Sequence, residues 1–192
     1  LPGGGGSLVV LGSGKQRGTQ GISRDAATAI LRDELVGLAP HLAQSGVTVL
    51  LEPLQAQVTD VLNGLHEART IIDSIGSPWV ASMLDFHNSQ DERDSWEALI
   101  ATHGDIIRHV HLNEVDGHHP SLVGRPGRAR SEYAAAFRAL AAAEYTGWIS
   151  LETFHTADSP ETVLAEARAF LESMTSVRQG QAFAPKSGPA RG

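Results

Sequence analysis

The stretch HLAQSGVTVLLEPL, residues 41–54, contains the end of one element and all of the next. Its first residues complete a helical pattern, and Gly46 stands where a residue of left-handed conformation ends a helix at low cost. The apolar run at 47–54 is short and rich in β-branched residues, which predicts a buried strand. An ionisable side chain, Glu52, interrupts this run near its end.

The same unit recurs along the chain. The other apolar runs occupy residues 8–12, 79–86, 106–112 and 148–154. Helical patterns cover residues 24–46, 61–76, 91–104, 131–147 and 159–176. Strands buried on both faces are typical of parallel sheets, and their regular alternation with helices implies right-handed crossovers. The chain is therefore expected to be α/β with a parallel sheet, either doubly wound or of the TIM-barrel type.

Glycine and serine residues mark the expected helix ends. Three further glycines stand between a helical pattern and a strand, as Gly46 does: Gly76, Gly104 and Gly147. We expect each of them to be left-handed. Ser131 and Ser159 stand at expected helix starts, where a hydroxyl oxygen can accept from a free backbone N–H.

Length and composition indicate one globular domain. The chain has 192 residues, of which 41% are hydrophobic, so it can bury a core of ordinary size. Residues 1–7 are rich in glycine, and residues 177–192 in glycine, proline and polar residues. We expect a flexible start, an ordered domain over 8–176 and a disordered tail.

Charge and cysteine content exclude several kinds of function. The net charge of −7 disfavours a nucleic-acid partner, and the 15 Lys and Arg residues form no dense run. The chain has no cysteine, so any metal must be held by His and carboxylate side chains. No apolar stretch is long enough to span a membrane, and no signal peptide is recognisable, which makes a cytoplasmic protein the simplest interpretation.

Each of the last four expected strands carries a candidate metal ligand at or near its C-terminal end: Glu52, Asp85, His111 and Glu152. The carboxyl ends of parallel strands lie on one face, so the four side chains are expected to converge there. Three carboxylates and an imidazole would repel and desolvate one another without a cation. Singly, each has a simpler explanation, such as a helix cap for Asp85 or a core position for His111. Together they predict one divalent metal, Mn²⁺, Mg²⁺ or Co²⁺, with Zn²⁺ as an alternative.

Two motifs carry a resemblance to a known family. One is the segment EPL...T...N...EA, formed by Glu52, Pro53, Leu54, Thr59, Asn63, Glu67 and Ala68. The other is LGSGKQR at 11–17, which is similar to a GSPKQR strand end. With the four candidate ligands, they make the chain from about Leu8 to about Leu171 resemble the xylose isomerase-like TIM barrels, in particular sugar phosphate isomerases/epimerases such as ketose 3-epimerases and hydroxypyruvate isomerase-like proteins.

The resemblance implies a partial barrel. A complete barrel has eight β/α units and about 250 residues. The five strands expected here correspond to strands four to eight, so we expect a truncated gene, a fragment or an incomplete reading frame. An open sheet exposes apolar edges, and we therefore expect the isolated chain to be marginally stable or to self-associate.

The resemblance also implies a function. It predicts a metal-dependent isomerase or epimerase that converts a ketose or related hydroxy-carbonyl compound through an enediolate, with Glu52 and Glu152 moving the proton. Four residues are candidate substrate contacts: His87, Lys15, Arg17 and His118. For His87 a helix cap is an equal alternative, and for Lys15 and Arg17 a solvated loop pair is the simpler one. The long loop 113–133 is a candidate lid, and His109 is expected to pack below the metal.

Other functions remain open at this point. Ala56 and Val58 stand where the epimerases usually carry Arg and Glu, and His87 follows Asp85 by two residues instead of three. A metal-dependent sugar lyase or dehydratase is one alternative, and an inactive fragment or interaction module is another. An endonuclease IV-like phosphodiesterase is less favoured, because it needs three metals and a basic groove.

Overall fold

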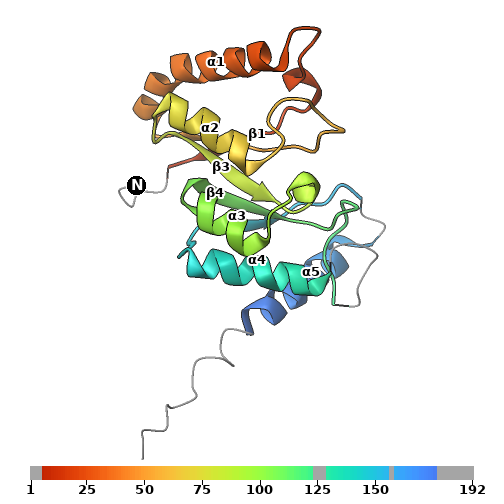
Figure 1. Cartoon of the computed structure of the whole chain (residues 1–192). Coiled ribbons are helices and arrows are strands. Elements are labelled where there is room, and N and C mark those ends of the chain that lie inside the picture. The colour runs from red at the N-terminus through yellow and green to blue at the C-terminus, as the bar shows by residue number, and fades with distance from the viewer. Residues whose placement is uncertain (1–5, 123–128, 156–157, 177–192) are drawn as a thin grey trace, which may run out of the picture.

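The computed structural model describes residues 6–122, 129–155 and 158–176 (Figure 1). Most of the expected flexible start and the whole expected tail lie outside these residues. Five parallel strands form one sheet: β1 (Leu8–Leu11), β2 (Thr48–Leu51), β3 (Val80–Asp85), β4 (Ile107–Leu112) and β5 (Trp148–Leu151). Their order across the sheet is the order of the sequence.

This strand order decides between the two architectures that the pattern allowed. In a doubly wound sheet the direction of winding reverses at a switch point. Here every crossover moves one strand in the same direction, from β1 to β5. The sheet is therefore the partial barrel that the sequence predicted, with five β/α units.

The strands alternate with five α-helices: α1 (Arg24–Ser45), α2 (Leu65–Ile75), α3 (Trp96–His103), α4 (Arg130–Ala142) and α5 (Pro160–Ser176). Three short 3₁₀ helices lie in the connections: η1 (Lys15–Arg17), η2 (Asn88–Asp91) and η3 (Gly104–Ile106). The helix expected at 61–76 begins four residues late, because Asn63 donates to two loop carbonyls. The helix expected at 91–104 begins at Trp96, where Ser95 accepts from the N–H of Ala98.

The two faces of the sheet have different contents. Leu51 packs in one apolar cluster with α1 and α2, and Leu84 in another with α3, α4 and α5. The opposite face carries a separate small cluster of Leu50, Ala81 and Met83. Side chains alternate between faces along a strand. Asp85 therefore lies on the face of Met83, away from the helices.

The expected helix ends are partly confirmed. Gly46 and Gly76 are left-handed, with φ of 68° and 65°. Gly104 is not, because its φ of −57° continues the chain into η3. After α4 the left-handed residue is Glu144, with φ of 54°, so the expectation for Gly147 is also wrong.

Gly147 is required by a close approach instead. A Cβ at this position would lie 2.4 Å from the hydroxyl oxygen of Tyr145. Ser159 caps α5 as expected, since its hydroxyl accepts from the N–H of Thr162 at 3.3 Å. Ser131 lies inside α4, whose start at Ala129 has no side-chain cap, so that prediction is wrong.

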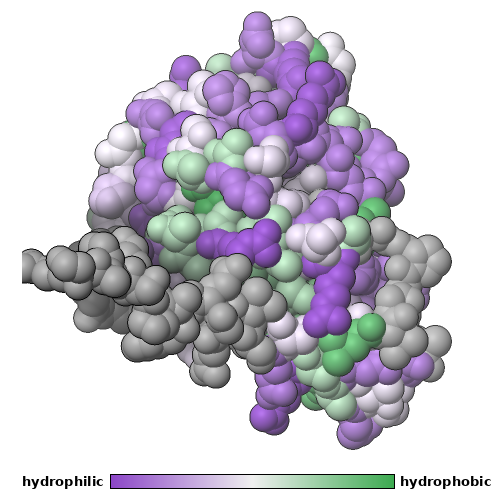
Figure 2. All heavy atoms as spheres, turned by 60° about the horizontal axis from the view of Figure 1, so that its bottom comes forward, coloured by the Kyte–Doolittle hydropathy of each residue, from purple (hydrophilic) through white to green (hydrophobic). Residues whose placement is uncertain are grey.

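Burial on both faces holds only for β2 and β3, since Arg108, His109 and His111 of the inner strand β4 are half-buried. Every residue of β2 and β3 is buried, whereas β1 exposes Leu8, Val9 and Val10, and Trp148 of β5 is 79% exposed. Within the described part of the chain, β1 and β5 each pair with a single neighbour. On the face shown in Figure 2, hydrophobic surface lies in patches among hydrophilic side chains. Among the described residues, no helix has the length and apolar character needed to cross a membrane.

Candidate metal centre

Four side chains from four neighbouring strands meet at one end of the sheet. Glu52, Asp85, His111 and Glu152 each offer a ligand atom, and these atoms all lie within 4.8 Å of one another. The strands β2, β3, β4 and β5 run parallel, so their carboxyl ends deliver the four residues to the same place. The convergence expected from the sequence is present.

His111 lies at the centre of the group. Its Nδ1 atom is 3.1 Å from Glu152 Oε2, 3.3 Å from Asp85 Oδ2 and 3.9 Å from Glu52 Oε1. His111 Nδ1 and Glu152 Oε2 are buried, yet neither makes a hydrogen bond. Buried polar atoms without partners are rare in native proteins, and a cation between them would satisfy both. His109 contacts His111 edge to face, with ring centroids 5.0 Å apart.

The electrostatics of the group favour added positive charge. Burial, reinforced by Asp85 and Glu152, raises the pKa of Glu52 to about 7. Burial alone would lower the pKa of His111, but Asp85 and Glu152 outweigh it and raise that pKa to about 10. For Asp85, burial opposes ionisation, yet the close approach of His111 and the hydrogen bond from the Asn88 N–H hold its pKa below the usual value. The metal-free cluster therefore keeps protons that a cation would replace.

Two buried asparagines that the sequence analysis missed support the carboxylates. The Asn88 N–H donates to Asp85 Oδ1 at 2.8 Å, and its side-chain amide donates to Glu52 Oε1 at 3.3 Å. The Asn113 amide donates to Asp85 Oδ2 at 3.3 Å, and its Oδ1 accepts from the His87 N–H at 2.7 Å. The sequence feature that could have indicated them is their position shortly after two candidate ligands, in DFHN (85–88) and HLNE (111–114). Asp85 thus caps η2 and also belongs to the cluster.

Gly12 makes room for Glu52. A Cβ at Gly12, just after β1, would lie 1.8 Å from Glu52 Oε2. No side chain fits there without displacing the carboxylate. The glycine in LGSGKQR therefore has a steric reason that the motif alone did not reveal.

The candidate substrate contacts have different surroundings. His87 does not cap η2 with its side chain; its Nδ1 lies 2.8 Å from the Val115 carbonyl oxygen. That carbonyl can only accept, so Nδ1 carries the proton. His118 Nδ1 lies 3.1 Å from Asp116 Oδ2, and Lys15 is exposed on η1.

Arg17 differs from the other candidates because it is buried. Its guanidinium donates to the backbone carbonyls of Leu11, Glu52 and Val61 at 2.8–3.1 Å. Burial lowers its pKa to about 10, so it stays charged at neutral pH. These bonds use three of its five N–H donors, and burial excludes the solvated loop position that was the simpler expectation.

The first part of the candidate lid is held in place. The Glu114 N–H donates to the His118 carbonyl at 2.8 Å, and the Phe154 N–H donates to the Gly117 carbonyl at 2.8 Å. His119 is fully buried, with Nε2 3.0 Å from Glu166 Oε2 on α5. Residues 113–122 are thus fastened to the segment after β5 and to α5, whereas residues 123–128 lie outside the described residues.

Comparisons with known proteins agree with this fold. A family model described as a xylose isomerase-like TIM barrel matches residues 4–174. A 3-dehydro-D-guloside 4-epimerase of Escherichia coli (strain K12) is 27% identical over 151 residues, which is 79% of this chain and 55% of that protein. An L-ribulose 3-epimerase of Methylomonas sp. (strain DH-1) is 26% identical over 117 residues, or 61% of this chain and 39% of that protein.

A solved structure shows the same fold. The apo form of a 3-keto-D-glucoside 4-epimerase from E. coli superposes with a TM-score of 0.72 at 23% identity. The match covers 88% of this chain and 63% of that one. The chain therefore spans about half the length of the first of these curated relatives and under two thirds of this structural one.

Proposed function

We propose a function from the premise that the chain belongs to the xylose isomerase-like TIM barrel family, whose model matches residues 4–174. One divalent cation binds to Glu52, Asp85, His111 and Glu152, and the site inverts a sugar carbon that lies next to a carbonyl group. The convergence of these four side chains within 4.8 Å carries the proposal.

The residues present fit such a cation. Three carboxylates and one imidazole form an oxygen-rich donor set, which suits Mn²⁺, Mg²⁺ or Co²⁺, with Zn²⁺ as the alternative. The unpartnered atoms His111 Nδ1 and Glu152 Oε2 face each other inside the group. Asn88 and Asn113 hydrogen-bond two of the carboxylates from outside, as is usual around metal ligands.

The bound cation would polarise the substrate carbonyl and offset the negative charge that develops on its oxygen. The acid and base chemistry falls to the two glutamates. In the metal-free chain, burial and the neighbouring carboxylates raise the pKa of Glu52 to about 7. A bound cation would favour the ionised carboxylate, which is the form that a general base needs. Glu152 is partly exposed, so a substrate can reach it.

Position in the sheet supports a division of labour between these glutamates. Glu52 follows β2 and Glu152 follows β5, with β3 and β4 between them. Carboxylates on two sides of a bound sugar can remove a proton from one face of a carbon and return one to the other face. Inversion requires that pair of steps. We assign the orientation of a substrate hydroxyl to His87, whose ring is held by the Val115 carbonyl.

The substrate class follows from the relatives. In a 3-dehydro sugar inverted at carbon 4, and in a ketose inverted at carbon 3, the inverted carbon lies next to the carbonyl. We carry this shared chemistry, and neither particular sugar, over to the present chain. A ketose or a keto-glycoside is therefore the proposed substrate.

Exchange with solvent deuterium tests the proposal. The Mn²⁺-loaded chain is incubated in D₂O with L-ribulose, D-fructose or a 3-keto-glucoside, and NMR follows the C–H next to the carbonyl. We expect deuterium at that carbon, dependent on the metal and abolished by a chelator. A product that has lost water would instead indicate a dehydratase. Metal binding without any exchange would indicate a binding module instead of an enzyme.

A further inference from the structure

Arg17 joins three segments that are distant in sequence. Its Nη1 donates to the carbonyl of Leu11 at the end of β1. Its Nη2 donates at 2.8 Å to the carbonyl of Glu52, just after β2. Its Nε donates at 3.1 Å to the carbonyl of Val61, where the loop that begins at Glu52 returns. One buried guanidinium thus spans both ends of the segment 52–61.

The same guanidinium also holds the backbone next to the place where Gly12 approaches the Glu52 carboxylate. Leu11, whose carbonyl it holds, immediately precedes Gly12, and a Cβ at Gly12 would overlap Glu52 Oε2 at 1.8 Å. The two backbone segments on either side of this close approach are therefore fixed by one side chain. A small relative shift of β1 and β2 would push Glu52 out of place.

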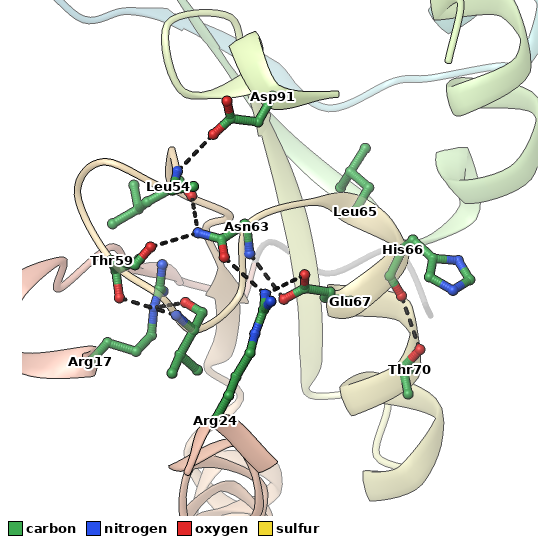
Figure 3. Close-up of polar contacts among 12 residues, drawn as sticks. Arg17, Arg24, Leu54, Thr59, Asn63, Leu65, His66, Glu67, Thr70 and Asp91 are labelled. Carbon is green, nitrogen blue, oxygen red and sulfur yellow. Dashed lines mark hydrogen bonds and ion pairs between the residues drawn. The ribbon is translucent and has the colours of Figure 1, made fainter. Parts of the chain in front are cut away.

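A second layer of contacts supports the far end of this loop (Figure 3). The Asn63 amide donates to the carbonyls of Leu54 and Thr59, both at 2.8 Å. Arg24 of α1 donates to Asn63 Oδ1 at 2.9 Å and pairs with Glu67 at 2.6 Å. These bonds hold the loop but do not touch Glu52, and the Arg24 side chain is half exposed.

We infer that Arg17 is a positioning residue for Glu52: it fixes the main chain on both sides of the Glu52 carboxylate in the geometry that metal binding needs. The inference rests on the proposed metal site. Only the planar fork of arginine reaches three carbonyls at fixed angles, so lysine, a point charge on a flexible stem, is not equivalent here. Outer groups that orient metal ligands typically change metal affinity about 10- to 100-fold when they are removed.

The test compares Arg17→Lys with Arg24→Lys as the matched control. Calorimetric titration of the metal-free full chain with Mn²⁺ should show about 10- to 100-fold weaker binding for Arg17→Lys. For Arg24→Lys the affinity should stay within about two-fold of the unaltered chain, because that arginine supports the same loop without holding Glu52. Both variants are melted without metal, so that a loss of fold is separated from a loss of affinity.

A spectroscopic measurement gives an independent result. The visible absorption of bound Co²⁺ reports ligand geometry, and it should change in Arg17→Lys and remain unaltered in Arg24→Lys. Arg17→Gln, which keeps an amide donor, replaces Arg17→Lys if the latter does not fold. A folded Arg17 variant with unaltered Mn²⁺ affinity and Co²⁺ spectrum would overturn the inference. If neither Arg17→Lys nor Arg17→Gln folds, the inference is also overturned, because Arg17 would then be needed for the stability of the fold. If the unaltered chain binds no metal, the proposed function itself is wrong.

Discussion

Glu52 and Glu152 stand at equivalent positions, each just after a parallel strand, but their surroundings differ. Glu52 follows the inner strand β2 and is 6% exposed. It accepts from Asn88, its carbonyl accepts from Arg17, and Gly12 leaves space for its carboxylate. Glu152 follows the edge strand β5, its side chain is 34% exposed, and its Oε2 makes no hydrogen bond.

The difference arises from the place of each strand in the sheet. An inner strand has two neighbours, so the residue after it is reached by groups from both sides. The edge strand β5 pairs only with β4 in the described part of the chain, and the Glu152 N–H donates to the Leu112 carbonyl of that strand. Glu52 is thus held by its surroundings, whereas Glu152 would take its geometry from the proposed cation.

The largest effect is expected from removing either carboxylate. Glu52→Gln and Glu152→Gln should each reduce deuterium exchange by about 1,000-fold or more, because an amide neither removes a proton nor binds the metal as a carboxylate does. Glu34→Gln, on the exposed surface of α1, serves as the control and should exchange normally. Exchange is measured by NMR at saturating Mn²⁺. Unchanged activity in Glu152→Gln would show that the acid/base assignment is wrong.

A substitution beside Glu52 should show whether metal affinity depends on the space that Gly12 leaves for the Glu52 carboxylate. In Gly12→Ala the new Cβ would overlap Glu52 Oε2, so Mn²⁺ affinity should fall about 10- to 100-fold. Gly37→Ala is the matched control, because nothing lies within 4 Å of its Cβ in α1, and it should stabilise the chain by about 0.5–1 kcal/mol. Calorimetry and thermal melts measure the two effects. Equal affinities in both variants would contradict the steric role of Gly12.

The metal-free stability should depend on pH through Glu52. Its folded pKa of about 7 lies above the ordinary 4.5, so its contribution is complete below pH 4.5 and is lost as pH rises through 7. This loss amounts to about 1–3 kcal/mol. Glu52→Gln should remove the part of the slope due to Glu52 and be more stable than the unaltered chain at pH 8, whereas Glu152→Gln should keep most of that part. The raised pKa of His111, about 10, leaves a fall in stability above pH 6.5 in all three chains. Denaturant melts at pH 5 and pH 8 check this, and equal slopes in all three chains would refute it.

Metal binding should release protons. His111, with a pKa of about 10, is protonated in the metal-free chain at pH 8, while Glu52, at about 7, is mostly ionised. Binding of Mn²⁺ should therefore release about one proton, since a metal needs the deprotonated imidazole. The apparent binding enthalpy is measured in buffers of different ionisation enthalpy. An enthalpy independent of the buffer would contradict this pairing of His111 with the carboxylates.

Local sequence patterns were sufficient for the order of elements and for the four candidate ligands. Short apolar runs, helical patterns and the glycine caps at Gly46 and Gly76 are each determined by residues that are close together in the sequence. The ligands were recognisable because polar residues at the ends of four successive buried runs are unusual. Their convergence then follows from parallel topology alone.

Features that depend on distant segments were not predictable. Val9 and Val49 stand in similar apolar runs, but Val9 is 50% exposed and Val49 is 7% exposed, because only one belongs to an inner strand. For Arg17 a solvated loop position was the simpler explanation and a substrate contact the other, since nothing nearby in sequence indicates that carbonyls 35 and 44 residues away would bury it. The steric need for glycine at position 12 was not predictable for the same reason, because the side chain for which it leaves space, Glu52, follows the next strand.

Calorimetric titration of the metal-free chain with Mn²⁺, beside Asp85→Asn, tests the central claim most directly. Asp85 is the most buried of the four side chains, at 2% exposed. We predict one ion bound per chain, with the binding heat lost in Asp85→Asn while the variant stays folded. An absence of binding by the unaltered chain, or equal binding by the variant, would contradict the claim that these four residues form a metal site.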